Sequence, residues 1–224
     1  LASSAASDVY KRQDREFAGE YLNKLNVYRD KRLFYNAWDI SVNYTKKKPA
    51  EFKLASHSVI LSDASVTREN VYTYGKSRII QKVVLTVGSP IVEFTTEVDW
   101  RETHKMLRAD FRPSVYADEV TCDIQMGNIK RSTRTQTKTE WAQFEICAHK
   151  WVDVTDGDAG VSVLTTGKYG WRVKDGLLSL NLLRSAVWPD PAADKGVHTI
   201  KYALYPHAGD YNQANTQSVA YFYN

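Results

Sequence analysis

Apolar and polar residues alternate over short stretches along most of the chain, and this spacing is typical of β-strands with one buried face. The clearest pair of strands is predicted at residues 78–87 and 91–100, joined by a turn at Gly88-Ser89-Pro90. Further strands are predicted within 14–30 and at 59–61, 71–74, 107–113, 120–126, 178–184 and 198–204. Because heptads and long amphipathic helices are missing from the pattern, the sequence predicts an all-β fold, a large antiparallel β-sandwich.

The stretch Phe144–Trp171 combines alternation with turn residues and large aromatic rings. Residues 142–148 alternate and predict a half-buried strand. An acidic turn at Asp156-Gly157-Asp158 follows, then an apolar run over 161–164. We therefore expect this stretch to form the centre of the domain.

Six phrases in the same order along the chain carry a family resemblance. Three runs of the first phrase lie in the central stretch: Phe144-Glu145-Ile146-Cys147-Ala148-His149-Lys150-Trp151-Val152-Asp153, Gly160-Val161-Ser162-Val163-Leu164 and Lys168-Tyr169-Gly170-Trp171. The others are Asn36-Ala37-Trp38-Asp39-Ile40, Val98-Asp99-Trp100-Arg101-Glu102, Gln125-Met126-Gly127-Asn128-Ile129-Lys130-Arg131, Leu182-Leu183-Arg184-Ser185 and Tyr202-Ala203-Leu204-Tyr205-Pro206-His207. Together they resemble the carboxy-terminal β domain of glycoside hydrolase family 38, the α-mannosidases. The chain departs from the family pattern at Thr165-Thr166-Gly167 and at Trp171, where the family has a tyrosine.

The resemblance implies a galactose-mutarotase-like supersandwich and a role in hydrolysing terminal α-D-mannosyl residues. Family members are retaining enzymes with an aspartate nucleophile, a second acid/base carboxylate and zinc or another divalent metal, all outside this β domain. No phrase of this chain matches those parts, so we expect no catalytic residue, no metal ligand and no activity in this chain alone. We expect the full-length enzyme to bind a mannosyl oligosaccharide through a catalytic domain that is missing from this chain.

Arg184 is the candidate substrate-binding residue. Counting every second residue from Leu178 puts Arg184 at the end of an inward-facing apolar row. An arginine at such a position must form an ion pair, donate hydrogen bonds to backbone carbonyl oxygens or point into a cleft. The resemblance implies that this arginine reaches towards the sugar. A structural ion pair is an equally good interpretation of the same position.

Other polar groups favour ordinary structural roles. His149, His198 and His207 lie too far apart in sequence for a metal motif. The aspartates of 153–158 lack the distal glutamate of a calcium loop and are better explained as a turn. The basic segment 128–138 is interpreted as a solvated connection.

Composition excludes some classes of protein. The chain has 224 residues, 43% of them hydrophobic, and a net charge of +4 that is too mild and dispersed to predict nucleic-acid binding. It contains no apolar run long enough to span a membrane and no visible signal peptide, so cytoplasmic or vacuolar localisation is favoured. Cys122 and Cys147 could form one disulfide, but both lie within strand-like alternation, which favours free buried thiols; the sequence leaves open whether they pair.

Residues 1–13 resemble a translated cloning adapter and are expected to make no packed contacts. Residues 14–224 are interpreted as the β domain of an α-mannosidase, truncated at both ends. A stand-alone carbohydrate-binding sandwich, or a sandwich with a purely structural role, are the alternatives. The sequence leaves mannoside linkage and oligomeric state open.

Overall fold

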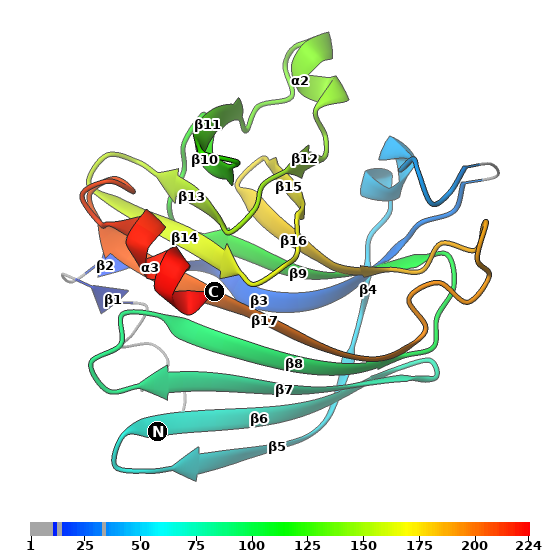
Figure 1. Ribbon diagram of the computed structural model, residues 1–224, viewed down its shortest axis with the longest axis horizontal. Coiled ribbons are helices and arrows are strands. Elements are labelled where there is room, and N and C mark those ends of the chain that lie inside the picture. Colours follow the sequence, from blue (N-terminus) through cyan, green and yellow to red (C-terminus); the bar gives the residue numbers. More distant parts are fainter. Residues whose placement is uncertain (1–10, 13–14, 33–34) are drawn as a thin grey trace.

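Two antiparallel β-sheets face each other in the computed structural model, which describes residues 11–12, 15–32 and 35–224 (Figure 1). The larger sheet has nine strands in the order β11-β10-β13-β14-β17-β8-β7-β6-β5, and the smaller has six in the order β12-β15-β16-β9-β3-β4. Consecutive strands often pair, as in β5-β6-β7-β8, but β17 inserts between β14 and β8. This confirms the predicted antiparallel β-sandwich.

The strands of the nine-stranded sheet are β5 (Lys53–Leu61), β6 (Ser65–Tyr74), β7 (Ser77–Thr86), β8 (Val92–Trp100), β10 (Glu119–Ile124), β11 (Gly127–Ser132), β13 (Trp151–Thr155), β14 (Ala159–Thr165) and β17 (Gly196–Ala208). Those of the six-stranded sheet are β3 (Ala18–Arg29), β4 (Ala50–Glu51), β9 (Lys105–Pro113), β12 (Ile146–Cys147), β15 (Gly170–Lys174) and β16 (Leu177–Arg184). Two short strands, β1 (Lys11–Arg12) and β2 (Arg15–Glu16), pair with each other, and the helices are η1 (Val42–Lys46), α2 (Lys138–Ala142) and α3 (Thr216–Tyr223).

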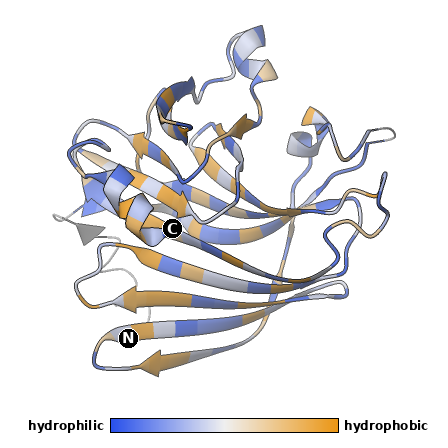
Figure 2. Cartoon of the chain, viewed as in Figure 1, coloured by the Kyte–Doolittle hydropathy of each residue, from blue (hydrophilic) through white to orange (hydrophobic). Residues whose placement is uncertain are grey.

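The main core fills the space between the two sheets, and residues from most strands point into it, whereas the edge strand β5 is exposed along its whole length. Figure 2 shows hydrophobic and hydrophilic residues mixed along the strands, as expected when each strand has one buried face. Phe94 of β8 stacks on Tyr202 of β17 with ring centroids 5.1 Å apart, and Phe111 of β9 meets both rings edge-on from the other sheet. Because these rings are almost fully buried, they form the aromatic centre of the core.

A group of hydrogen-bonded polar side chains spans the same core. Gln81 of β7 is fully buried, and its amide nitrogen donates to the hydroxyls of Thr96 and Tyr202, both at 2.9 Å. Asn23 of β3 completes the group, donating to the Gln81 amide oxygen at 2.8 Å and accepting from the Tyr202 hydroxyl at 2.6 Å. These paired groups join the two sheets without an unmatched donor on Gln81.

Helix α3 covers the outer face of the nine-stranded sheet (Figure 1). Its Ala220 packs in a second apolar cluster with Trp151, Leu164, Ala203 and Tyr205. Most of the apolar and aromatic residues at 219–224 belong to this helix. In the part of the chain that the structure describes, no helix is long and apolar enough to cross a membrane.

Several local predictions are confirmed and others are wrong. The hairpin predicted at 78–87 and 91–100 is β7 and β8. The strand predicted at 142–148 shrinks to β12, because the capping box of Thr137 and Glu140 starts α2 in the preceding segment. Half of the supposed basic loop 128–138 is strand β11, paired along β10.

Two sequence expectations concern the chain's first residues and its cysteines. Of residues 1–13, positions 1–10 and 13 lie outside the described residues, while Lys11 and Arg12 pair with Arg15–Glu16. Both cysteines are free, as predicted, and Cys122 is buried. Cys147 is exposed, contrary to prediction, because it lies on the edge strand β12.

Candidate functional site

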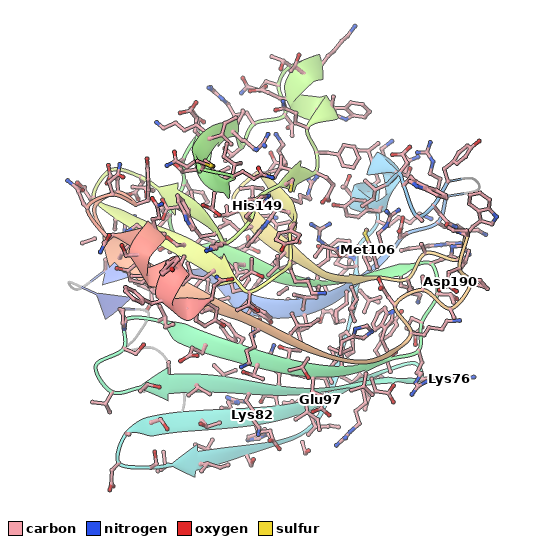
Figure 3. The ribbon with its side chains drawn as sticks, viewed as in Figure 1. Lys76, Lys82, Glu97, Met106, His149 and Asp190 are labelled. Carbon is pink, nitrogen blue, oxygen red and sulfur yellow. The ribbon has the colours of Figure 1, made fainter. Side chains whose placement is uncertain are left out.

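A β-bulge decides which face of the six-stranded sheet carries Arg184. In the β16–β9 pair, Leu180 faces Ala109 and then, after a register shift, Leu183 faces Leu107 and Arg184 faces Met106. Counting by twos across this bulge fails, because the extra residue turns the following side chains to the opposite face. Arg184 therefore lies beside Met106, outside the main core, and its predicted place on the inward-facing row is wrong. Figure 3 shows Met106 on this side of the sheet.

Arg184 joins three separate segments of the chain. Its Nε donates to the Asp30 carboxylate at 2.5 Å, and its Nη2 donates to the carbonyl oxygen of Asp39 at 2.6 Å. Its backbone N–H donates to the Asp194 carboxylate at 3.1 Å. The Arg184 side chain is 18% exposed, whereas that of Asp30 is 2% exposed.

This ion pair is incompletely satisfied. Among the residues that the structure describes, none hydrogen-bonds Nη1 of Arg184 or the buried Oδ1 of Asp30. Buried polar atoms in proteins are usually paired, so unpaired atoms at both ends of one ion pair are unusual. The guanidinium keeps one nitrogen available to a ligand while its other contacts hold it in place.

Three exposed aromatic rings, which we call the aromatic cluster, lie on the two loops that Arg184 connects. They are Tyr35, Trp38 and Trp188, with 64%, 64% and 54% of their surfaces exposed. Their ring centroids are separated by 5.2–6.3 Å, with Trp38 and Trp188 the closest pair. The Asn36 side-chain oxygen accepts from the backbone N–H of Trp188 at 3.1 Å, which fixes one loop against the other.

A cavity of about 560 Å³ lies beside the aromatic cluster. We call it the aromatic cavity, and it is lined by Lys31, Arg32, Tyr35, Asn36, His104, Val187 and Trp188. Its wall combines aromatic faces with cations and an amide. Concave sites with ring faces and a few polar groups are typical of small-molecule binding, including sugars, whose apolar faces stack on rings.

Next to Arg184 on the same face, Arg108 of β9 is the centre of a buried ionic network. Its Nη1 and Nη2 donate to the two oxygens of Glu145 at 2.8 and 3.2 Å. Its Nε donates to the Ser179 hydroxyl at 2.8 Å, and Nη1 also donates to the Tyr44 hydroxyl at 3.1 Å. Burial, the largest single effect, lowers the pKa of Arg108, but Glu145, Tyr44 and Asp110 together outweigh it, so the pKa is raised above its ordinary value.

Asp110, two residues along β9, is the second anion of this network. It is fully buried and accepts from the Asn26 amide at 2.7 Å, the Tyr28 hydroxyl at 2.6 Å and the Ser179 hydroxyl. Each of its oxygens is therefore bonded. Because Asp110 and Arg108 are both saturated with protein contacts, we assign this network to holding β3, β9 and β16 together.

Asp153, His207 and Ser162 form a buried polar cluster beneath α3. The Asp153 carboxylate lies 2.6 Å from His207 Nε2 and accepts from the Ser162 hydroxyl at 2.6 Å, and Thr216 of α3 lies 3.2 Å from the same hydroxyl. All are enclosed in protein. This cluster fastens the helix to the sheet and has no exposed nucleophile.

The structure keeps the candidate metal ligands of the sequence apart. His149 packs on Tyr169, His198 bonds the Asp194 carbonyl oxygen and His207 bonds Asp153. Asp156, from the suspected calcium loop, pairs with Arg15 and accepts from the Ala159 N–H as a turn aspartate. Within the described ranges, no group of three or more His, Cys, Asp or Glu residues could hold a metal ion.

Comparison with known proteins identifies the family of this sandwich. The family model described as "Glycosyl hydrolases family 38 C-terminal domain" matches residues 3–192, most of the chain and the whole of the Arg184 region. The chain belongs to glycoside hydrolase family 38. Its family 38 β-sandwich is thus the carboxy-terminal domain type, as its sequence phrases predicted.

Curated family 38 relatives agree. The chain is 34% identical over 205 residues to "Alpha-mannosidase 2C1" of Mus musculus, covering 90% of this chain and 20% of that protein. It is 31% identical over 230 residues to "Alpha-mannosidase G" of Dictyostelium discoideum, covering 100% of this chain and 21% of the relative. The chain therefore spans about a fifth of the length of these relatives.

A solved structure confirms the fold. The α-mannosidase from Enterococcus faecalis V583 superposes with a TM-score of 0.76 at 15% sequence identity, covering 89% of this chain and 27% of that one. At this identity the likeness concerns architecture alone.

Proposed function

We propose that this chain is the non-catalytic β domain of a retaining α-mannosidase and that Arg184 contacts the mannoside. The observation that carries the proposal is the position of Arg184 within a family 38 match, held by Asp30 and the Asp39 carbonyl oxygen, with its Nη1 bonded to none of the residues that the structure describes. Its substrate is a mannosyl oligosaccharide, hydrolysed at a site to which this domain contributes a wall.

The reacting groups belong to another part of the protein in this proposal. Retaining glycosidases need two carboxyl groups about 5–5.5 Å apart, one as nucleophile and one as acid/base. Zinc, or another divalent metal of the full-length enzyme, would bind the sugar hydroxyls there. The described residues of this chain contain no cluster that fits such a metal, so none of its side chains is given a role in metal binding.

Arg184 supplies orientation in this scheme. Its Nε and Nη2 are fixed by Asp30 and Asp39, so the direction of Nη1 is set before the sugar arrives. A pre-oriented planar donor loses little freedom when a hydroxyl binds, and its bonds can strengthen as the ring distorts towards the transition state.

The exposed aromatic cluster supports a second candidate, a carbohydrate-binding sandwich that needs no hydrolase partner. Three mutually packed rings beside a cavity could hold a sugar in this chain alone. Methyl α-mannoside binding by the isolated chain, with no hydrolysis by the parent polypeptide, would favour this candidate over the first.

The test of Arg184 is kinetic and uses the parent polypeptide that carries this chain. Arg184→Ala should lower kcat/KM for 4-nitrophenyl α-mannoside by at least about tenfold, equivalent to ~1.4 kcal/mol of transition-state stabilisation. Arg184→Lys should recover only part of this loss, because a point charge cannot reproduce the planar fork. The isolated chain should not hydrolyse this substrate.

The effect of Arg184 on folding stability must be separated from its effect on substrate orientation, because Arg184→Ala leaves the buried Asp30 without its partner. The double variant Asp30→Asn/Arg184→Ala removes both charges and should recover the melting temperature but not the activity. Arg172→Ala is a matched control, since this neighbouring arginine is 17% exposed and should retain normal kinetics. Normal kinetics in the double variant would reject the proposed role of Arg184.

A further inference from the structure

A second cavity, the basic cavity, lies where β3, the segment after η1 and the start of β9 meet. Its volume is about 560 Å³. The cationic side chains on its wall are Arg29 and Lys31 from the end of β3, Lys47 and Lys48 after η1, and Lys105 of β9. Two lysines of the run Lys46-Lys47-Lys48 thus form part of the wall of a concave site.

Among the described residues that line the basic cavity, none carries a carboxylate. Among the described residues, Arg29, Lys31, Lys47 and Lys48 form no ion pair within 4.0 Å. Lys105 donates to the Tyr74 hydroxyl and lies over its ring, so its charge is not neutralised either. Several uncompensated charges of one sign around a cavity produce a focused positive potential.

The neighbouring acids are already occupied by other partners. Asp30, between two of the cavity cations in sequence, does not line the basic cavity, and its Oδ2 accepts from Arg184, although it lines an adjacent pocket with Arg29, Lys31 and Lys47. Glu51 pairs with Lys24 at 2.8 Å, and Glu102 accepts from Ser77 at 3.3 Å. Asp30 and Glu51 lie near some of these cations and reduce the positive charge, but neither carboxylate lines the basic cavity, whose wall stays cationic.

The basic cavity adjoins the aromatic cavity, because Lys31 and His104 line both. His104 is held at this junction by two backbone bonds, its N–H donating to Ser185 and its carbonyl oxygen accepting from Asp30. A ligand that fills both cavities meets aromatic faces at one end and cations at the other. That combination suits a sugar ring that carries an anionic group.

We infer that the adjoining cavities bind a phosphorylated saccharide, with the sugar ring on Trp188 and the phosphate monoester among Lys31, Lys47 and Lys48. A phosphate ester carries up to two negative charges and several acceptor oxygens, which ammonium groups bind as point charges. The inference that the phosphate is attached to a sugar rests on the proposed function. The anion site itself does not, since it requires only the basic cavity.

The experiment measures binding to the 224-residue chain by titration calorimetry in a buffer free of phosphate. The probes are inorganic phosphate, mannose and mannose 6-phosphate. Mannose 6-phosphate should bind at least roughly tenfold more tightly than either of the others, because it alone occupies both cavities. Lys47→Ala/Lys48→Ala should weaken binding of both phosphate probes by roughly tenfold, since it removes half of the exposed charge.

Matched variants separate the two halves of the site. Lys130→Ala/Lys138→Ala removes the same charge from β11 and α2, far from the cavity lining, and should leave binding unchanged. Trp188→Ala should weaken mannose 6-phosphate but not inorganic phosphate. All substituted side chains are exposed, so melting curves should match those of the unmodified chain.

Three results would overturn the inference. The first is no binding of either phosphate probe at millimolar concentration. The second is an equal loss of binding in the two lysine double variants, which would mean attraction to overall charge. The third is equal binding of inorganic phosphate and mannose 6-phosphate, which would remove the sugar from the site. The Arg184 kinetics are measured separately, so a failure here leaves the proposed function untouched.

Discussion

Replacing Glu145 with alanine should destabilise the sandwich substantially, because it leaves the charge of Arg108 buried. The Arg108 side chain is 1% exposed, and Glu145 accepts from both of its terminal nitrogens. Removing one partner of a buried ion pair costs about 3–5 kcal/mol of unfolding free energy. The lower end applies here, because Glu145 is 18% exposed and water can enter the vacated space, and because Arg108 keeps its bonds to Ser179.

We therefore expect Glu145→Ala to lower the unfolding free energy by about 3 kcal/mol. For a chain of this size, 1 kcal/mol corresponds to roughly 2–4 °C in melting temperature, so the midpoint should fall by roughly 6–12 °C. Thermal unfolding followed by circular dichroism and urea titration give the two values. An unchanged urea m-value would show that the loss is one of stability.

Two further variants identify the cause. Arg108→Met/Glu145→Leu removes both charges, and buried pairs replaced by apolar residues of similar size are often neutral or more stable, so it should be more stable than Glu145→Ala. Glu119→Ala removes the exposed partner of Lys130 and should change stability by less than about 1 kcal/mol. If Glu145→Ala changes stability no more than Glu119→Ala does, the reasoning about buried charge is refuted.

Two other predictions concern titratable groups. Burial raises the pKa of the Cys122 thiol to about 12, so a thiol reagent at neutral pH should modify exposed Cys147 quickly and Cys122 only as the protein opens. Cys147→Ser should remove the fast phase of modification. Equal modification rates for the two cysteines would contradict the prediction. Burial also raises the pKa values of Tyr28, Tyr44 and Tyr202, so the folded state keeps protons that the unfolded chain loses near pH 10. The stabilisation of the folded state by these tyrosines is complete below pH 10 and is lost as the pH rises above it. The unfolding free energy should therefore fall by up to about 1.4 kcal/mol per pH unit for each tyrosine. Urea unfolding between pH 8 and 11 measures this slope, which Tyr202→Phe should reduce; an unchanged slope would disprove the assignment for that residue.

Strands that pair along most of their length could be predicted from the sequence because their alternation reflects a single buried face. The β7–β8 hairpin and β17 agree with their patterns closely. Residues 142–148 also alternate, yet they contain the end of α2, because a capping box and short-range hydrogen bonds compete with weak alternation. Alternation alone cannot distinguish a strand with a long partner from one with almost none.

Part of the ionic network of Arg108 could have been predicted from the sequence. Met106, Arg108 and Asp110 share one face of a strand by period two, and two buried charges on one face are a signal that the sequence analysis did not use. Their partner Glu145 could not be found this way. It lies 37 positions along the chain and reaches Arg108 only through the folding of α2 and β12 around the sheet edge.

The sequence by itself determined the fold class and the family, because these depend on local periodicity and ordered phrases. Tertiary structure decided the face on which Arg184 lies, since one bulge between Asn181 and Leu183 changes the alternation that counting assumes. It also decided which charges meet: the lysines after η1, Lys31 and Lys105 are separate in sequence and gather around one cavity only when β3 and β9 pair. Long-range strand pairing positions these groups, and no local pattern records it.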